Sequence, residues 1–335
     1  MNPIRIGTRS STLALWQAHW VEEKLQRHGF ASQIVKIGTS GDRDRQQPIS
    51  ELGIEGVFTK EIQRALLDGA IDLAVHSLKD LPTETVEGLE FVASPKRGPY
   101  RDAFVSNKAD TLDLLPDGSR IGTGSVRRKA QLLNLFGTRF QIVDIRGNVE
   151  TRLKKLDAGD SDAGCSNAAP SDAGHGKAAS YDAIVLAEAG LVRLGLHERI
   201  TAFLEPPQFL PAIGQGALGI EIRSDDTGKL SAAMDCLNDL PTYAAVTAER
   251  SLLRSLRGGC LAPIAAFCEV KQSAKASLTL TARVLSPDGQ QRLEAAQSQP
   301  ILFSQNNNTI RDIATELGRD VADKLLAAGA DRLLR

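Results

Sequence analysis

Short apolar runs alternate with amphipathic stretches along the first part of the chain, as expected for strands that alternate with helices. Residues 4–9, "IRIGTR", form an apolar run that ends in a polar turn. Apolar positions then recur with a helical period over residues 12–28, and Ser10 and Ser11 can cap that helix. The same alternation predicts strands at 33–37 and 71–77 and a helix at 57–70. Alternation of this kind indicates βαβ units and a mostly parallel sheet.

The pattern restarts near residue 120 and changes character in the tail. Expected strands cover 120–125, 140–147 and 181–187, and expected helices cover 126–136, 149–159 and 188–195. The chain is expected to cross between the two units near residues 94–102. The tail combines a helix at 247–256, an alternating strand at 278–286 and a long amphipathic helix at 310–330. The predicted fold class is therefore α/β, with two α/β domains and a smaller α+β C-terminal domain.

One segment follows neither period. Residues 161–180 read "SDAGCSNAAP" and then "SDAGHGKAAS", a quasi-repeat rich in Ala, Gly and Ser. Such a composition cannot bury a core, so residues 160–180 are predicted to be a flexible surface insertion. Cys165 and His175 lie within it, but two potential ligands on a flexible segment are weak support for a metal site, and none is expected.

Composition narrows the class of protein. The 335 residues are 42% hydrophobic and 24% charged, which fits a soluble globular protein of two or three domains. There is no apolar run long enough to span a membrane and no stretch resembling a signal peptide, so a cytoplasmic protein without a membrane partner is expected. A net charge of −1 argues against nucleic acid as a partner. The four cysteines lack C-x-x-C spacing and are expected to be free thiols.

Polar side chains follow the apolar strand in "AVHSLKDLP", residues 74–82. Ligands of open α/β sheets bind beyond the carboxyl ends of the strands, which is where Lys79 and Asp80 fall. The pair is either part of such a site or an ordinary surface ion pair. His76, within the strand, fits a packed or hydrogen-bonded histidine better than a catalyst.

Two further segments have the character of anion sites. In "GTGSVRR", Thr123 and Ser125 precede a helix whose first turn carries Arg127 and Arg128. Free backbone N–H groups at a helix N-terminus favour an anion, and guanidinium groups suit carboxylates. The alternative is a capped helix with solvated arginines. "DIRGNVETRL" repeats the arrangement with Arg146 and Arg152, so a ligand with several carboxylates is indicated.

Cys260 directly follows two glycines in "RSLRGGCLAP", which leaves room for a bulky group beside the thiol. Arg257 could lower the pKa of this thiol, but no histidine is near in sequence, so a cysteine-protease mechanism is disfavoured. The alternative is a small buried hydrophobic residue, which is expected for Cys236 and Cys268.

Taken together, these segments resemble the porphobilinogen deaminase (hydroxymethylbilane synthase) family over nearly the whole chain. The matching segments, in order, are "IGTRSSTLALWQA", "GVFTKEIQRALLDGAIDLAVHSLKDLPTE", "RDAFVS", "IGTGSVRRKAQL", "IRGNVETRLKKLD", "YDAIVLAEAGLVRLGL", "LPAIGQGALGIE", "TAERSLL" and "GGCLAPI". The resemblance implies two α/β domains like those of periplasmic binding proteins, with the site in the cleft between them, and a third domain that carries the cofactor cysteine. The expected boundaries are 1–97 with 216–238, then 98–215, then 239–335.

The resemblance implies an enzyme of the transferase class. Four porphobilinogen molecules would be joined head to tail, with loss of ammonia, into the linear tetrapyrrole 1-hydroxymethylbilane, which hydrolysis then releases. A dipyrromethane cofactor, bound to Cys260 through a thioether, would prime the chain and stay behind. The thiol is then an anchor rather than a nucleophile used in each turnover.

The same resemblance assigns site residues. Asp80 matches the catalytic aspartate, whose carboxylate would stabilise the azafulvene cation left by ammonia and handle protons. Cofactor contacts are implied for Cys260, Ser11, Lys79, Asp80, Thr123, Ser125, Arg127, Arg128, Arg146 and Gly147. Substrate contacts are implied for Arg9, Ser11, Arg146, Arg152 and Arg193. Acetate and propionate groups give each pyrrole about two negative charges, which accounts for the arginines. No metal is implied.

Several expectations concern the surroundings of the site. Glu55 stands where the family often has a lysine, which leaves Lys60 as the basic residue near that loop. The resemblance implies a monomer that passes its product to a downstream tetrapyrrole-cyclising enzyme. The competing hypothesis is a non-catalytic α/β module that binds a small polycarboxylate. The third domain with "GGC" favours the enzyme.

Overall fold

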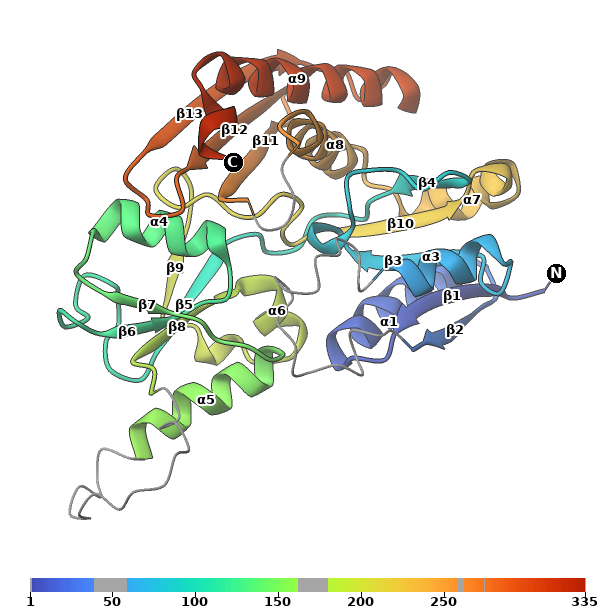
Figure 1. The fold of residues 1–335 in the computed structure, drawn as a ribbon. Helices are drawn as coiled ribbons and strands as arrows, with labels where there is room; N and C mark the ends of the chain where they lie inside the picture. Colours follow the sequence, from blue (N-terminus) through green and yellow to red (C-terminus); the bar gives the residue numbers. More distant parts are fainter. Residues whose placement is uncertain (1, 39–58, 162–179, 258–261, 274, 335) are drawn as a thin grey trace.

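The computed structural model describes residues 2–38, 59–161, 180–257, 262–273 and 275–334. The described strands form three sheets, and each has its own helices (Figure 1). The first two sheets lie side by side, and the unit built on the third lies across both. The α/β class with a smaller C-terminal unit is therefore confirmed. The predictions for residues within 39–58, 162–179 and 258–261, including those for Glu55, Cys165, His175 and Cys260, concern residues that the structure does not describe.

The first sheet has the order β2-β1-β3-β10-β4. Its strands are β1 (Ile4–Arg9), β2 (Ser32–Ile37), β3 (Leu73–Ser77), β4 (Leu89–Ala93) and β10 (Leu218–Arg223). β1 pairs in parallel with β2 and β3, as the alternating pattern predicts. β10 pairs antiparallel with both β3 and β4, although it lies far along the chain. After it has formed the second sheet, the chain thus returns and completes the first sheet with β10. The sequence pattern did not predict β4 or β10 as strands.

Two helices of the first unit test the predicted boundaries. α1 (Thr12–Arg27) begins where expected, because the Ser11 hydroxyl accepts a hydrogen bond of 3.3 Å from the Ala14 N–H. α3 (Lys60–Leu67) is shorter than the predicted helix 57–70, and residues 57 and 58 of that prediction are not described. β3 begins at Leu73 rather than at residue 71.

The second sheet repeats the plan, with the order β7-β6-β8-β5-β9. Its strands are β5 (Asp102–Ser106), β6 (Arg120–Gly122), β7 (Gln141–Val143), β8 (Ala183–Ala187) and β9 (Ala202–Leu204). Its helices are α4 (Val126–Phe136), α5 (Val149–Ser161) and α6 (Glu188–Arg193). α4 has the predicted bounds, whereas β7 is shorter than the predicted strand 140–147. β5 and β9 were missed; β5 pairs antiparallel with β8, as β10 does with β3.

The C-terminal unit is a three-stranded antiparallel sheet covered by two long helices. Its strands are β11 (Ile264–Lys271), β12 (Ser277–Leu285) and β13 (Arg292–Pro300), and its helices are α8 (Leu240–Ser255), α9 (Asn307–Ala327) and the short α10 (Ala330–Leu333). α8 begins seven residues before the predicted start at 247, because the Asp239 carboxylate caps it and Pro241 fits its first turn. β11 and β13 were missed, as was α7 (Thr227–Leu237), which precedes this unit.

The chain crosses between the first two sheets twice, before β5 and before β10, and the two crossings lie side by side. The Gly98 N–H donates to the Gly216 carbonyl at 3.2 Å. The Gln215 Nε2 donates to the Tyr100 carbonyl at 2.8 Å. Gly216 has a φ of +84°, and a Cβ there would lie 2.4 Å from the Pro99 carbonyl oxygen. Only glycine fits here, so the two crossings pack too closely to accept a larger side chain at position 216.

Polar contacts fasten the C-terminal unit to both sheets. The Arg311 Nη1 lies 2.8 Å from the Glu90 carboxylate on β4. The Arg283 guanidinium donates to Gln131 Oε1 on α4 at 3.1 Å and to the Pro207 carbonyl at 2.9 Å.

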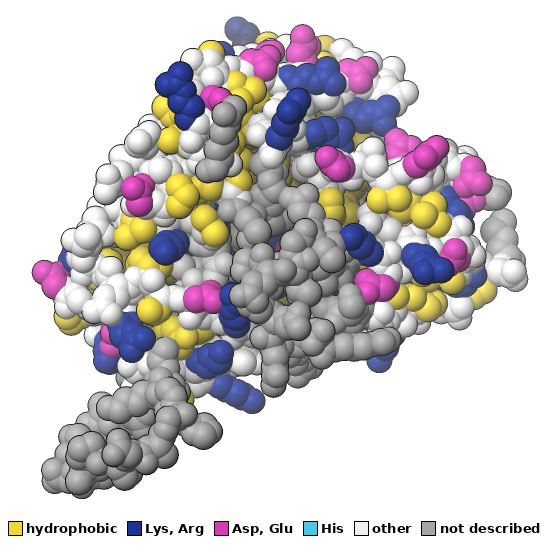
Figure 2. Space-filling view, viewed as in Figure 1, with side chains coloured by type: hydrophobic (Ala, Val, Ile, Leu, Met, Phe, Trp, Pro, Cys, Tyr) yellow, Lys and Arg dark blue, Asp and Glu magenta, His cyan; other side chains and the backbone are white. Residues whose placement is uncertain are grey.

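On the face drawn in Figure 2, acidic, basic and hydrophobic side chains are intermixed over the described surface. None of the described helices is long and apolar enough to cross a membrane.

Gly318 marks the closest approach of α8 and α9. A Cβ at this position would lie 2.4 Å from the Ala248 carbonyl oxygen and 2.6 Å from the Ser251 Cβ. We expect Gly318→Ala to lower the free energy of unfolding by about 1–3 kcal/mol through overpacking. That loss exceeds the gain of about 1 kcal/mol in helix propensity. Urea unfolding followed by circular dichroism measures the change.

The matched control is Gly228→Ala in α7, where a Cβ would meet nothing within 4 Å. This substitution should raise the free energy of unfolding by up to about 1 kcal/mol. Equal effects of the two substitutions would contradict the close packing of α8 on α9.

Candidate functional site

A short turn presents two charged side chains at the carboxyl end of β3. The strand ends at Ser77 and continues as a 3₁₀ turn over Leu78–Asp80. Leu78 and Leu81 are buried, so Lys79 and Asp80, which lie between them, face outward. The strand-end placement that the sequence predicted for this pair is therefore correct. His76, within β3, is buried, and its Nε2 lies 3.1 Å from the Glu221 carboxylate, as expected for a packed or hydrogen-bonded histidine.

The pair lies in a cavity of about 270 Å³ bounded by all three units. The first unit contributes Leu78, Lys79, Asp80, Leu81, Pro82 and Thr83, and the second contributes Gly124, Ser125, Arg127, Arg128 and Arg152. The crossing before β10 contributes Ala212, Ile213 and Gln215, and the C-terminal unit contributes Arg250, Leu253, Ala262 and Ile264. The cavity thus gathers strand ends and helix ends that are far apart in the sequence.

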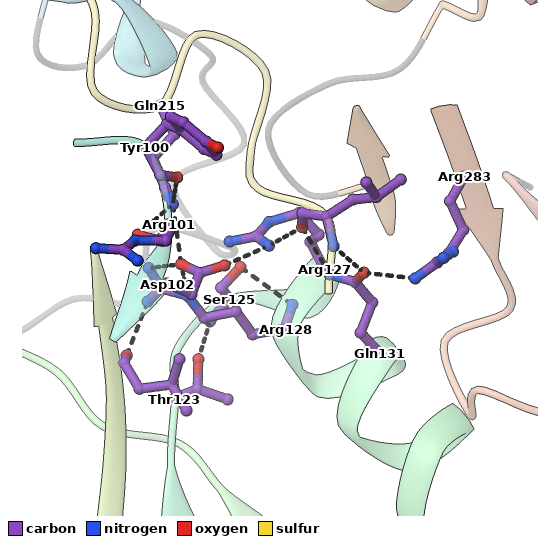
Figure 3. A network of polar contacts seen from close by, with 12 residues as sticks. Tyr100, Arg101, Asp102, Thr123, Ser125, Arg127, Arg128, Gln131, Gln215 and Arg283 are labelled. Carbon is purple, nitrogen blue, oxygen red and sulfur yellow. Dashed lines mark hydrogen bonds and ion pairs between the residues drawn. The ribbon is translucent and has the colours of Figure 1, made fainter. Parts of the chain in front are cut away.

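The N-terminus of α4 supplies the arginine pair. The Ser125 hydroxyl accepts from the Arg128 N–H at 3.4 Å and caps the helix, and Thr123 Oγ1 accepts from the Ser125 N–H at 3.2 Å. Arg127 and Arg128 are only 5% and 6% exposed, so the alternative of solvated arginines is wrong. Their guanidinium groups converge on Asp102, the first residue of β5 (Figure 3).

Asp102 is fully buried and shared by both arginines. Arg127 Nη1 donates to Asp102 Oδ2 at 2.7 Å, and Arg128 Nε and Nη2 donate to Oδ1 at 2.9 and 2.7 Å. Gln215 Nε2 donates to the same Oδ1 at 3.1 Å. Burial by itself would raise the pKa of Asp102, but the charges of Arg127 and Arg128 outweigh it and lower that pKa to about 2. One carboxylate between two guanidinium groups leaves a surplus positive charge.

Two more basic side chains, those of Lys79 and Arg152, line the cavity. Lys79 is open to the cleft, yet the surrounding protein removes water from its ammonium group, and the resulting desolvation lowers its pKa. Asp80 opposes that shift, and Arg128 adds to it. Desolvation also lowers the pKa of Arg152 to about 10, with a further contribution from Arg128. With a pKa of about 10, the Arg152 guanidinium stays charged near neutrality and adds to the surplus charge of the arginine pair, so the cavity favours an anionic ligand.

Other residues that the resemblance assigned are not part of the lining of this cavity. Arg146 donates from Nε to Asp144 at 2.7 Å, and Gly147, with a φ of +111°, accepts at its carbonyl from Arg152 Nε at 2.8 Å. Arg9 ends β1 and Ser11 caps α1. Their assigned contacts with cofactor or substrate stay predictions.

Arg193 lies at the chain crossing. Its Nη2 donates to the Gly216 carbonyl at 2.7 Å, and its guanidinium carbon lies 5.6 Å from the centre of the Trp16 ring on α1. Burial lowers its pKa to about 10. Arg193 therefore joins α6, α1 and the crossing, and its assigned role in binding substrate stays a prediction.

Among the residues of the site that were not predicted, three hydrogen-bond through their side chains: Asp102, Gln215 and Arg250. Each lies in a segment that carried the family resemblance, "RDAFVS", "LPAIGQGALGIE" or "TAERSLL". None follows a predicted strand or opens a predicted helix with a capping residue. Local pattern therefore gave no reason to select them.

The described cysteines differ from what a reactive thiol requires. Burial raises the pKa of Cys268, and burial likewise raises that of Cys236. Cys260 is not among the described residues, but Ala262, two residues later in the sequence, lines the cavity. No group of three or more potential metal ligands occurs among the residues for which the structure gives side chains.

Comparison with known proteins identifies the family. The family model for "porphobilinogen deaminase, dipyromethane cofactor binding domain" matches residues 4–231. The model for "porphobilinogen deaminase, C-terminal domain" matches residues 243–327. The two models together cover the units that line the cavity.

Curated porphobilinogen deaminases match this chain over nearly its full length. The porphobilinogen deaminase of Trichlorobacter lovleyi is 44% identical over 99% of this chain and 95% of its own. That of Geobacter sulfurreducens is 42% identical over 100% of this chain and 94% of its own, and that of Chromobacterium violaceum is 43% identical over 100% and 97%.

Among solved structures, the methionine-binding protein MetQ aligns with a TM-score of 0.41 and 14% identity over 72% of this chain and 91% of its own. The immunogenic lipoprotein A of Vibrio vulnificus aligns with a TM-score of 0.40 and 12% identity over 73% and 99%. The two family models and the full-length relatives decide the assignment: the chain belongs to the porphobilinogen deaminase family, whose members are transferases that carry a dipyrromethane cofactor.

Proposed function

We propose that this porphobilinogen deaminase lengthens its pyrrole chain in the cavity between the three units, with Asp80 as the catalytic carboxylate. The observation that carries this proposal is the convergence of Asp80, a surplus of cations and the flank of the Cys260 segment on one cavity. The substrate brings carboxylates that need cations, and its reacting centre develops positive charge that needs a carboxylate. The described lining supplies both kinds of group.

The residues present fit the dipyrromethane cofactor, which supplies the pyrrole carbon to which the first substrate is joined. The fit rests on charge and on an unused donor. The Nε–H of Arg127 is buried and has no hydrogen-bond acceptor among the described residues, and Asp102 balances only part of the charge of the arginine pair. We infer that Lys79, Ser125, Arg127 and Arg128 hold cofactor carboxylates and that Cys260 holds the cofactor through a thioether. Ser11, Thr123, Arg146 and Gly147 complete the proposed set of cofactor contacts.

Asp80 is proposed to act on the pyrrole rather than on the carboxylates. It lies outside the arginine–Asp102 network and faces the cleft beside Lys79. A carboxylate in this place stabilises the positive charge that develops as ammonia leaves and accepts a proton as the new carbon–carbon bond is completed. Arg9, Ser11, Arg146, Arg152 and Arg193 are proposed to bind the acetate and propionate groups of substrate and growing chain.

The organisation of the molecule is part of the proposal. We propose domains at 1–97 with 216–238, at 98–215 and at 239–335, because these ranges follow the three sheets and the two crossings. We also propose a cytoplasmic monomer that interacts with neither nucleic acid nor a membrane and that passes its product to a tetrapyrrole-cyclising enzyme. The segment 160–180 is proposed to be a tolerated surface insertion.

The alternative of a polycarboxylate-binding module without catalysis makes a different prediction for the thiol. A binding module has no need of a covalent pyrrole group, whereas the deaminase depends on one. The mass of the protein therefore separates the two functions.

The first prediction concerns the anchor. The intact mass of the purified protein, denatured and under reductant, should exceed the polypeptide mass by two linked pyrrole units. Cys260→Ser should lack this excess, because a hydroxyl does not replace the thiolate as a nucleophile. Cys236→Ser is the matched control and should keep it. A bare mass that persists after porphobilinogen is added would favour the binding module.

The second prediction concerns Asp80. Asp80→Asn should keep the covalent cofactor and lose about 10²–10⁴-fold in kcat, the range for removal of a positioned acid–base or charge-stabilising group. Porphobilinogen consumption and intact mass are the measurements. Parental turnover in Asp80→Asn would rule out the assigned role.

The third prediction concerns the arginine pair. Arg128→Met removes a charge-assisted contact worth about 1.5–3 kcal/mol, so cofactor loading or the KM for porphobilinogen should worsen by about 10–100-fold. Arg139→Met is the control, because Arg139 pairs with Asp117 at 2.7 Å on the surface. Thermal unfolding of both variants accounts for losses of stability. Normal loading together with normal KM in Arg128→Met would contradict the proposed contact.

A further inference from the structure

After Asp80, the Leu81 N–H donates to the Leu78 carbonyl at 3.2 Å and closes the turn, but no backbone N–H of a described residue donates to the carbonyls of residues 81–83. Leu81 is extended, with φ −84° and ψ 118°, and it precedes Pro82, which has no N–H to donate. β3 has already ended, so no strand ladder continues through this loop. The carbonyl groups of these residues therefore need donors from elsewhere in the molecule.

Helix α8 supplies these donors. Arg250 Nη1 donates to the Leu81 carbonyl at 2.8 Å, and Nη2 donates to the Pro82 carbonyl at 2.7 Å. One turn later, Arg254 Nε donates to the Thr83 carbonyl at 2.9 Å. Three consecutive carbonyls of the loop are thus bound by two arginines of one helix. Because the guanidinium group is planar and forked, its two bonds fix direction as well as distance.

The Arg250 side chain is itself held in place. Its guanidinium carbon lies 5.5 Å from the centre of the Phe91 ring, and that ring stacks on Tyr243 of α8 at 5.3 Å. Apolar contacts also hold the loop on α8. Leu78 and Leu81 pack in one buried cluster with Val246, which lies one helical turn before Arg250. α8 therefore contacts the loop on both sides of Lys79 and Asp80 in the sequence, at Leu78 and from Leu81 onward.

The same helix leads toward the cysteine. α8 ends at Ser255, five residues before Cys260 in the sequence, and Leu253 near its end lines the cavity together with Ala262 beyond the cysteine. α8 thus contacts the Asp80 loop and leads in sequence into the segment with the proposed anchor. A shift of the loop along α8 would change the distance between the carboxylate and anything attached at Cys260.

We propose that Arg250 is a positioning residue, which holds the Asp80 loop on α8 so that the carboxylate keeps its place relative to the pyrroles attached at Cys260. This inference rests on the proposed role of Asp80. Arg250 lines the cavity, but both of its Nη groups are engaged by loop carbonyls rather than directed to a ligand. Its effect should therefore fall on kcat, through Asp80, and not on the KM for the anionic substrate.

Arg250→Met in the cofactor-loaded enzyme is the test, with steady-state rates of porphobilinogen consumption as the measurement. We expect kcat to fall by about 10–100-fold, the range for a misplacement of about 1 Å at a reacting centre. The KM should stay within about twofold, and the intact mass should retain the cofactor. Arg250→Lys should lose several-fold in kcat, because an ammonium group cannot serve both carbonyls as a fork does.

Arg311→Met is the matched control. It removes a contact of 2.8 Å to Glu90 between the same two parts of the molecule, at a place outside the cavity lining. Its kcat should be parental. An equal loss in Arg250→Met and Arg311→Met would mean that any weakened interface slows the enzyme, and a raised KM with parental kcat in Arg250→Met would mean that Arg250 binds substrate. Either result overturns the inference.

A double variant separates positioning from an independent contribution. If Arg250 acts only through Asp80, then Asp80→Asn with Arg250→Met should be no slower than Asp80→Asn alone. Multiplied losses of kcat would contradict the inference.

Should Arg250→Met fail to fold, a parental kcat in cofactor-loaded Arg250→Lys would overturn the inference. An inactive Asp80→Asn beside a fully active Arg250→Met would refute only this inference, whereas an active Asp80→Asn would refute the proposed function.

Discussion

The geometry of the site depends on one buried carboxylate, that of Asp102. It lies between the guanidinium groups of Arg127 and Arg128, and it accepts a further bond from Gln215 on the crossing before β10 (Figure 3). A buried charge without a partner is strongly destabilising, so these four side chains must keep their arrangement while the protein is folded. The anion site of the second unit and the path of the chain back to the first unit are therefore determined by the same pair of oxygen atoms.

The structure separates two tasks that acidic residues perform. Asp102 is removed from water and serves the arginines, and its pKa of about 2 keeps it ionised throughout the neutral range. Asp80 faces the cleft on a turn whose leucines point the other way. A carboxylate that balances fixed cations cannot also follow a changing charge on a substrate, because it is already fully engaged. Placing the two groups on different units lets one be rigid while the other is available to the ligand.

Sequence reasoning succeeded where the physical cause is local. Ser125 and the apolar period of the following residues predict α4 with its observed bounds, and the polar residues after β3 predict a site at Lys79 and Asp80. It failed where the cause lies far along the chain. β10 forms because β3 and β4 are there to pair with it, and nothing within its own six residues indicates that neighbour. For the same reason the arginines could be assigned to an anion site, but not to Asp102.

The charge of the cavity, like the strand pairing, depends on residues that are far apart in the sequence. The chain as a whole carries −1, which describes its surface and says little about its ligand. In the cavity lining and the network behind it, the basic residues Lys79, Arg127, Arg128, Arg152 and Arg250 outnumber the acidic residues Asp80 and Asp102. These cations come from three units that are near neutral in combination, so the local excess exists only once the units are assembled. An attraction for a polyanionic chain is thus a property of the packed structure, and it follows that contacts between the units are as much a part of the binding site as the arginines themselves.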